Sequence, residues 1–256
     1  MTITAIVCAY NEAQHLPACL HSLLAQTRPP DEILVVNNAS TDATGAVARA
    51  IPGVRVLDEP TKGLVIARET ARRAARSDVL AYVDADCRTP ITWLDRVERR
   101  LQALPDAVAV TGPYRFYDWD VAGRTLIWLY DWIVAPPTHV LVHHVMHAGA
   151  ILYGGNFAVR AAALAQIGGF DRRIEFHGED TNLGRRLTPL GGVATSVCLT
   201  INAAPASLRS LPSVRSRPDP ESLGTHRRLS FSKTPRRPDP MDQMSSHRQS
   251  HAGWRS

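Results

Sequence analysis

The sequence contains only four cysteines, and no two of them stand at a spacing typical of a paired site. Cys8, Cys19, Cys87 and Cys198 form neither a C-x-x-C motif nor the regular framework of a disulfide-rich domain. This argues against a thiolate zinc site and against a protein stabilised by disulfides. A reducing compartment is the environment that the pattern favours.

A long hydrophobic run is also missing. The closest approach to one, residues 125–146, is interrupted by Asp131, by Pro136-Pro137 and by three histidines. The N-terminus has no signal-peptide layout, because an apolar strand-like run is followed closely by Glu12. We therefore expect no spanning helix and a cytoplasmic protein, in contact at most with the inner face of a membrane.

The charge is uneven along the chain. The whole sequence carries a net charge of +5, but residues 1–202 hold 19 Lys and Arg against 20 Asp and Glu, whereas residues 203–256 hold 10 against 4. The basic character thus belongs to the tail, and a nucleic-acid function would rest on the tail alone. The tail, residues 203–256, is rich in Pro, Ser and Arg and lacks hydrophobic periodicity, so we expect it to be disordered.

The first half of the chain alternates short β-branched runs with helical patterns. Such alternation predicts an α/β fold with a mostly parallel central sheet flanked by helices. In the second half, residues 119–146 suggest one or two helices broken at Pro136-Pro137, and Gly168-Gly169 closes a further short helix. The predicted strands are Ile3–Ala9, 32–36, 54–57, 79–83, 108–110 and 151–159, and the predicted helices are 16–25, 41–50 (capped by Ser40 or Thr41), 63–75, 89–104, 160–167 and 179–190.

Polar residues follow four of the predicted strands directly. In parallel sheets ligands bind at the carboxyl ends of the strands, so these residues are expected to meet in one pocket. They are Tyr10-Asn11-Glu12, Asn37-Asn38, Asp58-Glu59 and Asp84-Ala85-Asp86.

Asp84-Ala85-Asp86 is the candidate metal site. Two carboxylates two residues apart at a strand end can hold Mg²⁺ or Mn²⁺, whose coordination is often completed by substrate phosphates. The metal would then neutralise charge on a departing nucleoside diphosphate. Alone, the same pattern also fits a solvated turn that caps the next helix; its place after a buried strand favours the metal site.

Two further groups fit a nucleotide. The amides of Asn37 and Asn38 can read the edge of a base, although a plain turn with a helix cap is the alternative. Lys62 and Arg68 flank a helix start at Gly63 and can contact phosphate oxygens; ordinary solvated charge is the alternative.

Glu179-Asp180 opens a predicted helix after a Gly-rich approach. A carboxylate there can accept a proton from an acceptor hydroxyl as general base. First-turn acids are also favoured by the helix dipole without any catalytic role.

The segment 119–146 allows several interpretations. His139, His143 and His147 would share one helix face and could bind zinc, but a packed or interfacial face explains them better. Its Trp and Leu content fits either core packing or a helix that contacts a membrane surface or the acceptor.

Several short motifs, in this order and spacing, resemble those of family 2 glycosyltransferases, which have the GT-A fold. The resemblance covers about residues 2–200. It is carried by Ala9-Tyr10-Asn11-Glu12, Val36-Asn37-Asn38-Ala39-Ser40, Lys62-Gly63, Ala67-Arg68, Asp84-Ala85-Asp86, Gly154-Gly155-Asn156, Gly168-Gly169-Phe170-Asp171 and Gly178-Glu179-Asp180.

The resemblance implies a nucleotide-binding half, residues 1–115, and an acceptor half, residues 116–202. It implies inverting transfer from a UDP-, GDP- or dTDP-sugar to a glycan or lipid hydroxyl, with Mg²⁺ or Mn²⁺ as cofactor, as in cell-envelope polysaccharide synthesis. The implied nucleotide contacts are Ala9, Tyr10, Glu12, Asn37, Asn38, Lys62, Arg68 and Asp84; the metal ligands are Asp86 and Asp84; Asp180 is the base, and Glu179 positions the acceptor or the base.

The sequence departs from the family in three places. Asn37 and Asn38 stand where acids are common, which leaves the donor open. No Q-x-x-R-W-like motif follows Glu179-Asp180, which argues against a processive synthase. The tail resembles nothing in the family, so a frameshifted or truncated gene end is one hypothesis for it. A catalytically silent nucleotide-sugar-binding protein is the main alternative; a nucleotidyltransferase is disfavoured, because no Gly-rich phosphate loop with a lysine lies near the N-terminus.

Overall fold

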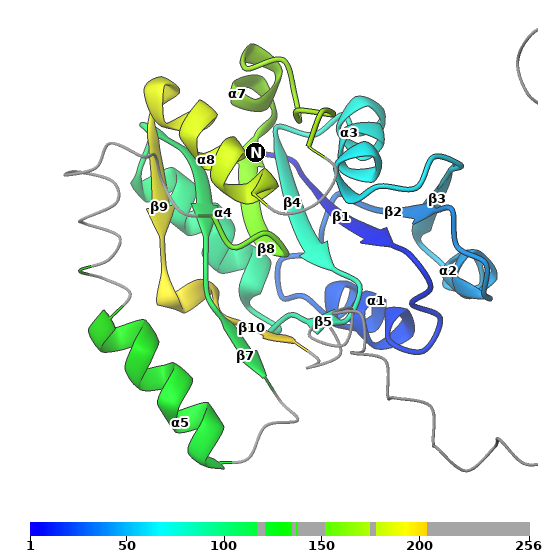
Figure 1. Ribbon diagram of the computed structural model, residues 1–256, viewed down its shortest axis with the longest axis horizontal. Coiled ribbons are helices and arrows are strands. Elements are labelled where there is room, and N and C mark those ends of the chain that lie inside the picture. The colour runs from blue at the N-terminus through cyan, green and yellow to red at the C-terminus, as the bar shows by residue number, and fades with distance from the viewer. Residues whose placement is uncertain (117–120, 135–136, 138–151, 175–177, 204–256) are drawn as a thin grey trace, which may run out of the picture. The chain divides into compact units, whose positions relative to one another are not determined.

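The computed structural model describes residues 1–116, 121–134, 137, 152–174 and 178–203 (Figure 1). The chain divides into two compact units, Met1–Pro212 and Ser213–Ser256, and all described residues belong to the first. The predicted disorder of the tail and the three histidines at 139, 143 and 147 lie outside the described residues.

The larger sheet of the described part has its strands in the order β3-β2-β1-β4-β8-β6-β9 (Figure 1). Neighbours run parallel except around β8, which is antiparallel to both β4 and β6. The expected α/β fold with a mostly parallel sheet is therefore confirmed. The strands are β1 (Ile3–Ala9), β2 (Glu32–Asn38), β3 (Val54–Glu59), β4 (Val79–Asp84), β6 (Ala107–Thr111), β8 (Asn156–Arg160) and β9 (Gly192–Thr195).

Helices cover both faces of this sheet. Because successive residues of a strand point to opposite faces, β1 contributes Val7 to the core on one side and Ile6 to the core on the other. Apolar residues of α1, α2 and α4 fill the first core, and those of α3, α7 and α8 fill the second. These helices are α1 (Leu16–Leu24), α2 (Thr44–Arg49), α3 (Leu64–Ala74), α4 (Trp93–Ala103), α7 (Ala161–Gln166) and α8 (Glu179–Leu187).

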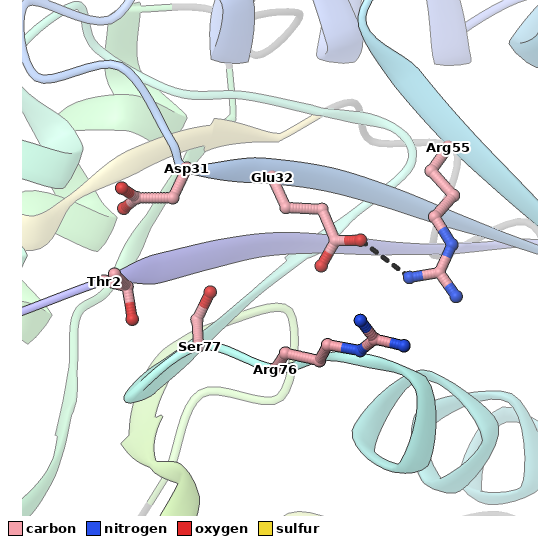
Figure 2. A pocket seen from close by; sticks show the side chains of 6 residues that line it. All are labelled: Thr2, Asp31, Glu32, Arg55, Arg76 and Ser77. Atoms are coloured by element: carbon pink, nitrogen blue, oxygen red, sulfur yellow. Dashed lines mark hydrogen bonds and ion pairs between the residues drawn. The ribbon is translucent and has the colours of Figure 1, made fainter.

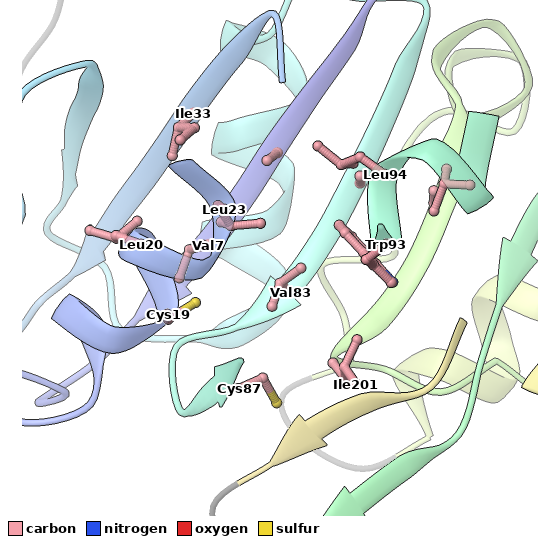
Figure 3. Close-up of a cluster of buried hydrophobic side chains, with 14 of the residues drawn as sticks. Val7, Cys19, Leu20, Leu23, Ile33, Val83, Cys87, Trp93, Leu94 and Ile201 are labelled. Atoms are coloured by element: carbon pink, nitrogen blue, oxygen red, sulfur yellow. The ribbon is translucent and has the colours of Figure 1, made fainter. Parts of the chain in front are cut away.

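The first core shows why the central strands are apolar along their whole length. In Figure 3, Leu20 and Leu23 of α1 and Trp93 of α4 lie over Val7 and Val83, on neighbouring strands. All of these side chains are at most 2% exposed. Burial on both faces is what parallel strands require, and it holds the carboxyl ends of β1 and β4 side by side.

Two predicted helix starts are wrong by three or four residues. Helix α2 begins at Thr44, its N-cap is Ala43 without a side-chain cap from Ser40 or Thr41, and the Thr44 backbone N–H donates to Asp42 Oδ1 at 2.9 Å. Helix α4 begins at Trp93, because the stretch ahead of it first forms a short strand, β5 (Cys87–Arg88). The helix over 160–167 and its Gly168-Gly169 end are confirmed, both glycines having positive φ.

A second, small sheet has the order β5-β10-β7 and joins distant parts of the chain. β10 (Ile201–Ala203) pairs with β5 and with β7 (Tyr114–Phe116). Strands of two or three residues are too short to show a hydrophobic periodicity, so the sequence did not predict them. Strand β9 was not predicted either. The effect of the small sheet is to place residues just after Asp86 beside the end of the described chain.

Helix α5 (Val121–Leu129), which continues as a π-helical turn (Tyr130–Val134), presents apolar side chains to solvent. Leu126 and Ile133 are 67% and 63% exposed, and Leu129, Tyr130 and Val134 are also exposed. The helical interpretation of this segment is confirmed over residues 121–134. In the described part of the chain, no helix is long and apolar enough to cross a membrane.

The amino edge of the sheet carries an open cavity of about 470 Å³ (Figure 2). Its charges are largely paired: Arg55 Nη1 lies 2.7 Å from Glu32 Oε1, and Asp31 Oδ2 lies 2.7 Å from Arg28 Nη1. Ligands of such sheets bind at the opposite, carboxyl edge, where the predicted site residues lie.

Candidate active site

The loops after β1 and β2 are fastened to each other at the carboxyl edge. Asn11 has a positive φ of 55°, a conformation that Asn tolerates better than most residues, and its Oδ1 accepts the Thr41 N–H at 2.8 Å. The Glu12 N–H donates to Thr44 Oγ1 at 2.8 Å. These contacts therefore hold two strand ends together, and α2 has no side-chain cap from Ser40 or Thr41.

A cavity of about 820 Å³ opens at this edge. Every residue predicted to bind nucleotide or metal or to act as base lines it, with the single exception of Asn37. Its lining also includes residues that sequence reasoning did not assign to the site. These are Cys8, Gly63, Leu64, Ala67, Ala85, Tyr114, Gly154 and Gly155.

Lys62 and Tyr10 form one wall of the cavity. The Lys62 ammonium lies 3.9 Å from the centre of the Tyr10 ring, a cation–π contact. Asn38 fixes the loop that carries Lys62, because its Oδ1 accepts the Gly63 N–H at 2.8 Å and its Nδ2 donates to the Thr61 carbonyl at 2.7 Å. The cavity therefore has a cation held in place by groups from two strand ends, Tyr10 after β1 and Asn38 of β2.

The two asparagines predicted to read a base are engaged elsewhere. The Asn38 amide is used in the loop contacts just described. Asn37 Nδ2 donates to Asp58 Oδ1 at 2.9 Å, and its Oδ1 is buried with no hydrogen-bond partner among the described residues. Asp58 and Glu59, also expected in the pocket, lie outside its lining. Of Asn37, Asn38, Asp58 and Glu59, only Asn38 lines the cavity.

Asp84 and Asp86 lie on the floor of the cavity, at the end of β4. The Asp84 side chain is 42% exposed. Desolvation of its carboxylate raises its pKa to about 6; the charge of Arg68 opposes the shift, and those of Asp86 and Glu179 add to it. Burial also raises the pKa of Asp86. Both carboxylates thus lack full compensation for their charge.

These residues fit a divalent cation that shares its ligands with a substrate. The cavity lining holds five carboxylates, those of Glu12, Asp84, Asp86, Glu179 and Asp180, against two cations, Lys62 and Arg68. Across the described residues there is no group of three or more His, Cys, Asp or Glu arranged to hold a metal ion. Two carboxylates with an excess of negative charge suit Mg²⁺ or Mn²⁺ completed by phosphate oxygens, in contrast to a closed structural site. Cys8 adds no thiolate, since burial raises its pKa to about 12.

Glu179 and Asp180 reach the same cavity from the first turn of α8. Gly178, with φ 82°, provides the left-handed turn from which the helix starts. Burial raises the pKa of Asp180 to about 6, again against the effect of Arg68. The sequence could not show that Asp180 faces Asp84 and Asp86, and it is the fold that brings the three carboxylates to one cavity.

Gly154 and Gly155 allow both acids to approach the backbone. A Cβ atom on Gly154 would overlap the Asp180 carboxylate, and one on Gly155 would overlap that of Asp84. The Gly155 N–H donates to the Tyr114 hydroxyl, and its carbonyl accepts the Asp84 N–H at 3.2 Å. The glycine pair is thus a template that sets the positions of the two carboxylates.

Asn156 anchors this template. It is fully buried; its Oδ1 accepts from Trp93 Nε1 at 3.0 Å, and its Nδ2 donates to the carbonyls of Gly112 and Leu199 at 2.8 and 2.6 Å. One side chain therefore ties the glycine pair to α4, to the turn before β7 and to the segment before β10. The motif Gly154-Gly155-Asn156 was the signal that could have identified these positions as part of the site.

Known proteins share sequence and fold features with this chain. The model of the family described as "Glycosyl transferase family 2" matches residues 4–168. Glycosyltransferase AglE of Haloferax volcanii is 34% identical over 101 residues, which are 37% of this chain and 33% of AglE. The glucosyl-dolichyl phosphate glucuronosyltransferase of the same organism is 24% identical over 73% of this chain and 58% of its own length.

Among solved structures, the mannosyltransferase PcManGT from Pyrobaculum calidifontis, in complex with GDP-Man and Mn²⁺, matches with a TM-score of 0.64 and 25% identity. The match covers 79% of this chain and 56% of PcManGT. This chain therefore aligns with a third to under two thirds of the length of these proteins.

Proposed function

The chain belongs to glycosyl transferase family 2, and from that premise we propose that it is an inverting, metal-assisted glycosyltransferase that moves a sugar from a nucleoside-diphosphate sugar to a hydroxyl acceptor. The observation that carries the proposal is one cavity lined by Asp84 at the end of β4, by Asp86 just after it and by Asp180 from α8. A metal-binding pair and a separate carboxylate with a raised pKa are the two chemical groups that the reaction needs.

The donor is proposed to lie between the Lys62 wall and the Asp84–Asp86 floor. The Lys62 ammonium would meet diphosphate oxygens, and Tyr10, whose ring it contacts, would stack on the nucleotide; their contact at the cavity supports this. Asp86 and Asp84 would hold Mg²⁺ or Mn²⁺, which would supply charge neutralisation for the departing diphosphate. The similarity to PcManGT, whose structure contains GDP-Man and Mn²⁺, supports this donor class without identifying the base or sugar for this chain.

Asp180 is proposed as the general base. It accepts the proton of the acceptor hydroxyl while that oxygen attacks the anomeric carbon from the side opposite the diphosphate. The bond from carbon to acceptor oxygen forms as the bond from carbon to the diphosphate oxygen breaks, so one displacement inverts the anomeric centre. Glu179, beside it, adds negative charge that disfavours ionised Asp180 and so keeps the base receptive to a proton.

A thermal-shift screen of UDP, GDP, dTDP and their sugars, with and without Mn²⁺, tests the proposal. We expect one nucleotide series to raise the Tm by about 5 °C or more at saturating concentration, only with the metal. Turnover should then release that nucleoside diphosphate. Stabilisation without turnover over a range of acceptors would favour a silent binding protein, and no stabilisation by any series would contradict both.

For the acceptor we propose a lipid-linked hydroxyl at a membrane surface, met through the exposed face of α5. Leu126, Leu129, Tyr130, Ile133 and Val134 recur at intervals of one helical turn and are exposed. This segment follows β7, whose Tyr114 lines the cavity, and one relative acts on a dolichyl-phosphate-linked sugar by its name. An exposed apolar stripe on the segment that follows β7 suits an acceptor that stays in the bilayer.

Vesicle sedimentation checks this assignment. We expect the full chain to bind vesicles of phosphatidylcholine with phosphatidylglycerol, and the double variant L126S/I133S to lose about tenfold in binding, since both side chains leave the lipid. The variant L24S, at an exposed leucine of α1, is the matched control and should bind like the wild type. Equal binding by L126S/I133S would reject the α5 face as the membrane contact.

A further inference from the structure

The buried guanidinium of Arg68 has an environment that does not suit a phosphate ligand. Arg68 lies on α3 with its side chain only 3% exposed, and its guanidinium carbon is 5.6 Å from the centre of the Phe157 ring. A guanidinium remains charged even when buried, so its charge must be balanced by the groups around it. Those groups are carboxylates of the cavity.

The two terminal nitrogens of Arg68 face different halves of the site. Nη1 lies 3.2 Å from Asp180 Oδ1, to which it donates a hydrogen bond, and 3.7 Å from Glu179 Oε1. Nη2 donates to the Gly154 carbonyl and lies 4.0 Å from Asp84 Oδ1. One planar fork therefore connects the first turn of α8 with the glycine template and the end of β4.

Asp180 is confined between this fork and the glycine pair. Arg68 holds one of its carboxylate oxygens from one side, and Gly154 lies against the carboxylate on the other. An ammonium group offers the same charge but no fixed fork, so it cannot hold Asp180 and the Gly154 carbonyl at the same time in this geometry. The charge of Arg68 also acts on Asp84, because the low-dielectric surroundings screen it weakly.

Resting on the proposed function, we propose that Arg68 is a positioning residue: its fork fixes Asp180 for the transfer step, and its charge moderates the affinity of Asp84 and Asp86 for a divalent cation. The two effects are separable. Only an arginine side chain has the planar fork of N–H groups, whereas a lysine side chain carries the same positive charge. Lys62, which is exposed to the cavity and stacked on Tyr10, is then the residue left to meet the phosphates.

The test compares R68K and R68Q with the wild type by Mn²⁺ titration followed by electron paramagnetic resonance, with the nucleoside diphosphate that stabilises the wild type present at saturation. We expect R68Q to bind Mn²⁺ about tenfold more tightly, because a positive charge near Asp84 is removed, and R68K to remain within about twofold of the wild type. In turnover of GDP-mannose and UDP-glucose, whichever the wild type uses, kcat should fall about 100-fold in both variants, with a much smaller change in donor KM.

R73Q is the matched control, since Arg73 lies five residues later on α3, is 63% exposed and pairs with Glu69 away from the cavity. It should leave both measurements unchanged. Unchanged or weaker Mn²⁺ binding in R68Q would overturn the charge effect. Wild-type kcat in R68K would overturn the positioning role, and this test remains open if R68Q fails to fold, because R68K keeps the buried charge. A wild type that binds no Mn²⁺ would instead contradict the proposed function.

Discussion

Replacing Asp180 by Asn is expected to lower kcat about 1,000-fold while the protein stays folded and still binds donor, because the proton acceptor is removed and the shape is kept. The Asn oxygen can still accept the hydrogen bond that Arg68 Nη1 donates to Asp180 in the wild type. The measurement is nucleoside diphosphate release in the presence of acceptor, together with donor binding by thermal shift. Wild-type kcat in D180N would reject Asp180 as the base.

The pH dependence gives the same residue a second test. Burial raises the pKa of Asp180 to about 6, so the basic, ionised form is lost as the pH falls through about 6, and kcat should fall with it and level off above about pH 7. Ionisation of a carboxyl whose pKa is raised on folding lowers stability as the pH rises toward that value. Asn carries no such charge, so D180N should have a Tm at pH 8 no lower than that of the wild type.

Gly154→Ala offers an independent perturbation of the base. The new Cβ would overlap the Asp180 carboxylate and displace it without removing it. We expect a kcat loss of about 100-fold, smaller than in D180N, with the acidic limb of the pH profile still present. Gly168→Ala is a control for a glycine substitution outside the cavity, since it removes a positive-φ glycine with open space around it and should change Tm but not kcat.

Asp86→Ala is expected to abolish both activity and the Mn²⁺-dependent part of nucleotide stabilisation. Asp84 alone would remain as a protein ligand, and a single carboxylate holds Mg²⁺ or Mn²⁺ weakly. In the thermal-shift assay, the Tm increase of about 5 °C from nucleotide with Mn²⁺ should fall to that from nucleotide alone.

The appropriate control is D58A, since Asp58 is also an aspartate at a strand end but lies outside the cavity and pairs with Arg49. It should keep the Mn²⁺ effect. Full Mn²⁺-dependent stabilisation in D86A would show that the metal is held by other groups and would contradict the assignment of the Asp84–Asp86 pair.

Much of the architecture can be predicted from the sequence, because it depends on short-range patterns. The apolar runs that became β1, β2 and β4 were identified because both faces of these strands are buried, and Gly168-Gly169 marked a helix end through positive φ. Strands β5, β7 and β10 were missed because each has two or three residues and exists only through pairing with distant segments.

The candidate site divides in the same way. The chemical types were present in the sequence: Asp84 and Asp86 after an apolar strand, and Glu179-Asp180 at a helix start. The family resemblance has these acids in the same order, and the family model matches residues 4–168, which include Asp84 and Asp86 but not Glu179-Asp180.

What the sequence alone determined, then, is the α/β alternation and the identity of the acids, because both follow from local periodicity and residue chemistry. Tertiary structure alone decided which charges meet. Arg68, which the sequence suggested as a phosphate contact, became the buried partner of Asp84, Glu179 and Asp180, and Asn37 was turned toward Asp58 and away from the cavity. Such pairings join residues up to 112 positions apart, and only packing of α3 and α8 on one face of the sheet brings them within hydrogen-bonding distance.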